Sequence, residues 1–65
     1  MNIRAFSESE FSEMLLLQKQ MAALTGEPVR AIAWSFIKRV ERGEIEDSPS
    51  AILEAMRSEL MYAKP

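Results

Sequence analysis

The chain has 65 residues, 48% of them hydrophobic, with two glycines, no cysteine and no histidine. This composition is too apolar for a disordered tail and too poor in glycine for a small barrel, and it excludes disulfides and the usual structural zinc site. The net charge of −2 argues against general attraction to nucleic acid. We therefore expect one all-α domain and, because a core of this size yields roughly 3–5 kcal/mol, support from a second copy.

The first six residues, 1–6, allow two interpretations. Met1, Ile3 and Ala5 alternate with Asn2, Arg4 and Phe6, and this period of two is compatible with a short strand. Chain ends are also often frayed. Both interpretations remain open from the sequence.

A first helix is predicted over about 7–25. Ser7 and Glu10 have the spacing of a capping box, and Gly26 can close the helix in a left-handed conformation. Apolar residues occupy about half of the helix circumference, which is more than one neighbouring helix can cover. We assign the excess to self-association, through Leu16, Leu17, Met21 and Leu24.

A second helix is predicted over about 28–42. Pro28 suits a first helical turn, and Gly43 follows the last turn. The range carries four basic residues against one acid, a local charge of +3, and three of the basic residues lie near the negative end of the helix dipole. The predicted buried face comprises Val29, Ile32, Ala33, Phe36, Ile37 and Val40.

An acidic linker, 43–48, separates this helix from a third one over about 49–63. Ser48 supplies a cap, and Pro49 takes the first helical position. Met61 points away from the predicted buried side. That side comprises Ile52, Leu53, Ala55, Met56, Leu60 and Ala63.

The strongest predicted binding feature is a row of side chains on the second helix, Arg30, Trp34 and Lys38, each one turn from the next. Tryptophan and arginine are enriched at interface hot spots. Trp34 could instead fold over a neighbouring segment and enlarge the core, and the sequence does not decide between the two. Leu16 and Met61 are the other large apolar residues that a three-helix monomer leaves exposed.

The residue inventory predicts no enzyme, cofactor or metal site. There is no histidine or cysteine, and no glycine-rich phosphate loop. The acidic residues Glu41, Glu44, Glu46 and Asp47 lack the spacing of a calcium loop and fit a solvated linker. No apolar run is long enough for a membrane helix or a signal peptide, so we expect a cytoplasmic protein.

These features favour a non-enzymatic regulator or adaptor that binds another protein. We expect a homodimeric three-helix unit, a helical hairpin plus a C-terminal helix, that presents Arg30, Trp34 and Lys38 to an acidic partner surface. It would inhibit or recruit a larger factor by covering or bridging it. The small size is compatible with a phage or plasmid accessory protein.

A second hypothesis is DNA binding. The segment Asn2 to Phe6, a helix opening at Ser7, a corner at Gly26 and a second helix ending before Gly43 resemble the ribbon-helix-helix repressor family. The resemblance covers residues 1–43. It implies an intertwined dimer whose paired N-terminal strands read the major groove through Asn2 and Arg4, with amides at the start of the second helix on phosphate.

Overall fold

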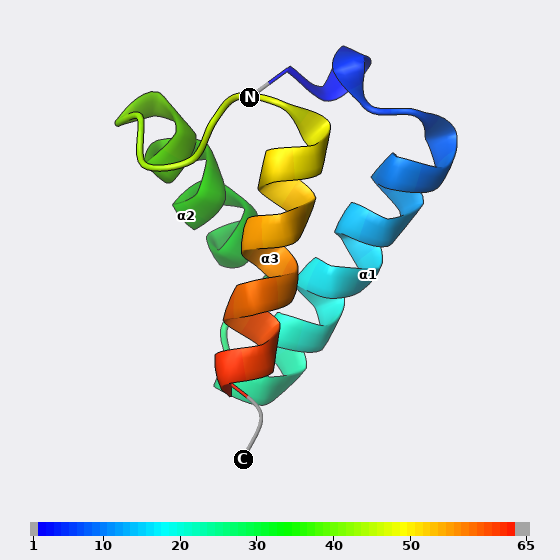
Figure 1. Cartoon of the computed structure of the whole chain (residues 1–65). Coiled ribbons are helices and arrows are strands. Elements are labelled where there is room, and N and C mark those ends of the chain that lie inside the picture. The colour runs from blue at the N-terminus through cyan, green and yellow to red at the C-terminus, as the bar shows by residue number, and fades with distance from the viewer. Residues whose placement is uncertain (1, 64–65) are drawn as a thin grey trace.

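The computed structural model describes residues 2–63, which form three α-helices after one short turn (Figure 1). The turn is a 3₁₀ helix, η1, over Ile3–Ala5. The helices are α1 over Glu8–Thr25, α2 over Val29–Glu41 and α3 over Pro49–Ala63. The predicted all-α, three-helix fold is thereby confirmed. Among the described residues, no helix combines the length and apolar character needed to cross a membrane.

The ends of α1 follow the local chemistry of its sequence. The Ser7 hydroxyl accepts from the amide of Glu10 at 3.2 Å, and the Glu10 carboxylate accepts from the amide of Ser7 at 2.8 Å, which completes the capping box. At the other end Gly26 has a φ of 77°, and its amide donates to the carbonyl of Ala22 at 2.9 Å. A residue with a Cβ is strained in that conformation, so the helix ends at its glycine.

The ends of α2 and α3 are also set locally. After α2, Gly43 has a φ of 77°, and the amide of Glu44 donates to the carbonyl of Arg39 at 2.9 Å in a Schellman arrangement. The Ser48 hydroxyl then accepts from the amide of Ala51 at 3.3 Å and caps α3. Both helices begin and end within about one residue of the predicted bounds.

The described N-terminal residues form a local turn, and not the short strand that was one of the two interpretations of the alternating pattern. The Asn2 side chain accepts from the amide of Arg4 at 3.1 Å, and the amide of Phe6 donates to the carbonyl of Ile3 at 3.1 Å. These bonds are local, whereas a strand needs a second chain segment to pair with. The side chain of Phe6 is half-buried and packs against the core.

Helix α1 is the central packing element, because it contacts both other helices and contacts α3 more extensively than α2. In Figure 1, α1 runs downward, α2 returns upward and α3 runs downward again. The C-terminal end of α2 diverges from α3 in this view. One continuous core joins all three helices and the segment before α3. It comprises Met14, Leu17, Met21, Ile32, Phe36, Val40, Ile45, Ile52, Leu53, Met56 and Leu60.

The acidic linker contributes one residue to this core. Ile45 is buried, although its neighbours Glu44 and Glu46 are exposed. The segment is therefore more than the purely solvated connection that its charge predicted, because one apolar side chain anchors it against the helices.

Candidate interaction surface

Arg30, Trp34 and Lys38, which we call the tryptophan row, lie together on the outer face of α2. All three side chains are exposed, and Trp34 has 58% of its surface accessible to solvent. The Lys38 ammonium nitrogen lies 5.5 Å from the centroid of the indole ring, within the range of a cation–π contact. The row therefore combines an exposed apolar ring with positive charge beside it, and the cation–π contact restricts the two side chains.

The choice between core and surface for Trp34 is decided by its position on α2. Ile32 and Phe36, two residues before and after it, are both buried and belong to the core. Two residues correspond to about 200° around an α-helix, so Trp34 points away from the core that holds its neighbours.

The basic region of α2 is divided by ion pairs. The Arg39 guanidinium lies 3.1 Å from the Glu59 carboxylate on α3, and Arg42 lies 2.6 Å from Glu44. Within residues 2–63, Arg30 and Lys38 take part in no ion pair. Of the four basic residues of this region, the two without an ion pair therefore lie on the two sides of Trp34.

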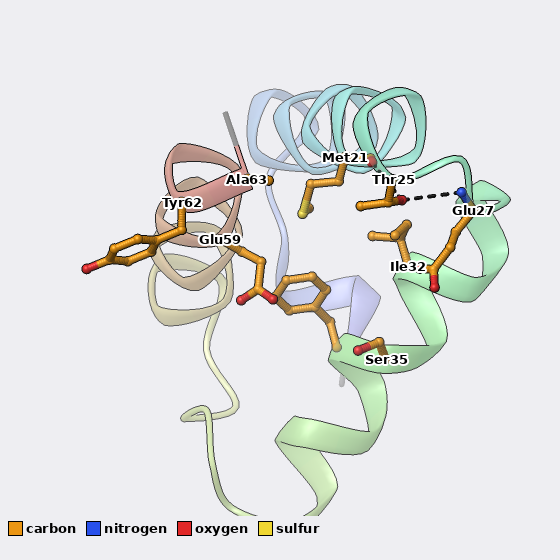
Figure 2. Close-up of a pocket in the computed structure, with 9 residues that line it drawn as sticks. Met21, Thr25, Glu27, Ile32, Ser35, Glu59, Tyr62 and Ala63 are labelled. Carbon is orange, nitrogen blue, oxygen red and sulfur yellow. Dashed lines mark hydrogen bonds between the residues drawn. The ribbon is translucent and has the colours of Figure 1, made fainter. Parts of the chain in front are cut away.

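A groove opens beside the tryptophan row, between α2 and the C-terminal half of α3, with a volume of about 310 Å³. Figure 2 shows α1 contributing Met21 and Thr25, α2 contributing Ile32 and Ser35, and α3 contributing Glu59 and an outward-extending Tyr62. Its floor is apolar. The lining residues are Met21, Thr25, Glu27, Ile32, Ser35, Phe36, Glu59, Tyr62 and Ala63.

The sequence did not predict this groove. Its lining comes from three helices, and periodicity within one helix carries no information about the gap between two others. The one residue that could have indicated a groove was Ser35, a small polar residue next to Trp34. A single serine on a helix does not by itself predict a cavity.

The predicted self-association set is split by the fold. Leu16 and Leu24 are 56% and 45% exposed, whereas Leu17 and Met21 are 8% and 3% exposed and belong to the core of the single chain. The assignment of Leu17 and Met21 to a dimer surface is therefore corrected, because both pack within this chain and Met21 also forms part of the groove floor.

Asn2 and Arg4, the residues expected to contact DNA, are both exposed at the N-terminal turn. The side chain of Asn2 caps this turn by accepting from the amide of Arg4. The paired strand that would project them into a groove of DNA is not formed here.

An ion pair joins α1 to α3. The Arg57 guanidinium donates to both Glu13 carboxylate oxygens, at 2.6 and 2.7 Å. These hydrogen bonds lower the pKa of Glu13 below its ordinary value of 4.5 and raise the pKa of Arg57. The pair is a bidentate contact between α1 and α3 that adds to their packing through the core.

Compared with protein-family models, curated protein sequences and solved structures, the chain gives no significant match. Its function must be inferred from its own surfaces.

Proposed function

We propose that this chain is a non-enzymatic regulatory or adaptor module that acts in the cytoplasm by binding an acidic surface of another protein through the tryptophan row, and that it self-associates as a homodimer. Binding would inhibit the partner by covering its working surface, or recruit it by bridging it to a further molecule.

The observation that carries the proposal is the exposure of Trp34 between two cationic side chains that have no ion-pair partner in residues 2–63. A tryptophan at the centre of a protein interface commonly contributes about 2 kcal/mol or more when its ring is desolvated. The Lys38 ammonium over the ring reduces the number of conformations that binding must fix.

Charge selects the class of partner. Carboxylates on the partner can pair with Arg30 and Lys38 while an apolar surface covers the indole ring. Arg30 adds geometric selectivity, because a guanidinium can bind a carboxylate through two parallel hydrogen bonds. Such complementary charge increases the association rate and fixes orientation more than it increases affinity.

The test is affinity capture from a cytoplasmic lysate, with and without nuclease and at two salt concentrations. We expect one stoichiometric protein that survives nuclease and is retained less well at high salt. Trp34→Ala should abolish its capture, whereas the matched control Met61→Ala, which removes a side chain 75% exposed on α3, should not. Both variants should keep wild-type helicity, because neither residue belongs to the core.

Two results would contradict the proposal. If Trp34→Ala captures the same protein as the wild type, the tryptophan row is not the binding site. If the recovered species is nucleic acid that is lost steeply with salt, DNA binding through Asn2 and Arg4 becomes the better hypothesis.

A further inference from the structure

The groove between α2 and α3 has an apolar floor and a negative rim. Glu27 and Glu59 stand at the rim, and the C-terminal ends of α1 and α3 adjoin it at Thr25 and Ala63. Helix C-termini carry partial negative charge, which adds to that of the carboxylates. Arg39 offsets part of the charge of Glu59, so Glu27 is the rim carboxylate without an ion pair among the described residues. The apolar floor and negative rim of the groove suit a ligand with an apolar part and a cationic group.

The chain itself carries a group of this kind. The Trp34 ring with the Lys38 ammonium above it combines a large apolar surface with a positive charge. A cavity of about 310 Å³ lies at the small end of the range of protein ligand pockets and suits a single large side chain better than a whole helix.

The Trp34 side chain and the groove are also neighbours on the surface. Trp34 and Ser35 are consecutive on α2, about 100° apart around the helix, and Ser35 lines the groove. Because the projecting Trp34 and the groove belong to one surface, two copies of that surface can pair around a two-fold axis, and both grooves are then filled at once.

We propose that a second copy of this chain occupies the groove: in a two-fold dimer with antiparallel α2 helices, each Trp34 enters the groove of the other copy. In this arrangement Lys38, one turn after Trp34, lies toward the N-terminal end of the partner's α2, where Glu27 stands. The inference gives the proposed homodimer its interface. It also makes self-association and binding of an acidic partner compete for Trp34.

A charge-swapped pair tests this pairing. Lys38→Glu and Glu27→Lys each place like charges together in their own homodimer and should weaken self-association at least about tenfold. An equimolar mixture of the two variants restores both opposite-charge contacts and should dimerise as the wild type does. Mass in solution is measured by analytical ultracentrifugation over a concentration series, with Lys19→Glu and Glu46→Lys as controls that reverse exposed charges away from the groove.

Intrinsic fluorescence reports on the same event independently. Trp34 is the only tryptophan in the chain, so its emission should shift to shorter wavelength as concentration increases and the ring leaves water. A wild type that stays monomeric at millimolar concentration, a dimer without a tryptophan shift, or a mixture of the charge variants that stays monomeric would each overturn the proposed pairing.

Glu27→Lys separates this inference from the proposed function. It places like charges at the groove, so it should self-associate more weakly, and it leaves the tryptophan row intact, so it should still capture the acidic partner. If it remains dimeric while partner capture persists, only the groove pairing is wrong. If it is monomeric and captures nothing that the wild type captures, the competition between the two forms of binding is wrong.

Discussion

At the scale of single residues, direction around a helix decides which of two similar neighbours stabilises the chain. Leu16 and Leu17 are adjacent and chemically identical, yet the first is mostly exposed and the second is buried against the core. One residue turns about 100° around an α-helix, which is enough to move a side chain from solvent to the packed side. Leu17 therefore contributes to folding, and a charge placed there tests the core rather than a dimer.

The pair Leu17→Asp and Leu16→Asp makes this difference measurable. A carboxylate at position 17 cannot be buried without a partner, so the substitution should remove several kcal/mol and unfold a domain of this size. The same change at position 16 should alter the free energy of unfolding by no more than about 0.5 kcal/mol. Urea titration followed by circular dichroism gives both values. A folded Leu17→Asp protein would show that this side chain is not part of the core.

At the scale of elements, the ends of the helices are set by local chemistry, and their mutual positions by the shared core and by contacts between helices. The capping box of α1 and the glycine after α2 act within a few residues of chain. The Glu13–Arg57 pair acts across 44 positions of sequence and ties α1 to α3. Because the folded state lowers the pKa of Glu13, the pair stabilises the fold above the ordinary carboxyl pKa, and this contribution is lost as the pH falls through the folded-state value.

Thermal unfolding of Glu13→Gln between pH 7 and pH 2 tests this linkage. The variant should melt at a lower temperature than the wild type at pH 7. The difference should shrink as the pH falls below the ordinary carboxyl value of 4.5 and disappear once Glu13 is protonated in the folded protein. Glu46→Gln, which removes a charge from the loop before α3, is the matched control. A difference in melting temperature that stays constant with pH would show that the ion pair is not its cause.

At the scale of the whole molecule, α2 packs less extensively on its neighbours than α3 does on α1, and a groove remains beside it. A chain of 65 residues buries a smaller fraction of its surface on folding than a larger domain does, so filling this groove has a large relative effect on stability. If a second copy fills it, folding and association become linked by mass action.

Melting temperature should therefore depend on protein concentration. For the wild type we expect an increase of several degrees over a hundredfold rise in concentration, because binding to the folded state alone contributes about 2.7 kcal/mol at a hundred times the dissociation constant. Glu27→Lys should show a smaller increase in melting temperature over the same range, because it associates more weakly. Differential scanning calorimetry checks both, and a concentration-independent wild type would argue against a dimer that is coupled to folding.

The sequence by itself determined the number of helices, their bounds and most of the core. Capping residues, glycines and prolines act on backbone groups within a few positions, and periodicity shows which face of each helix is apolar. It also predicted the tryptophan row, because residues four apart on one helix share a face whatever the rest of the molecule does.

Only the tertiary structure decided what depends on how the helices are placed against each other. It buried Leu17 and Met21 within one chain, exposed Trp34, paired Arg39 with Glu59 and opened the groove between α2 and α3. It also placed a local turn at Ile3–Ala5, where the sequence had left a short strand and a frayed end both open. Burial and cavities are properties of the space between elements, and no pattern within a single helix encodes the angle at which its neighbour crosses it.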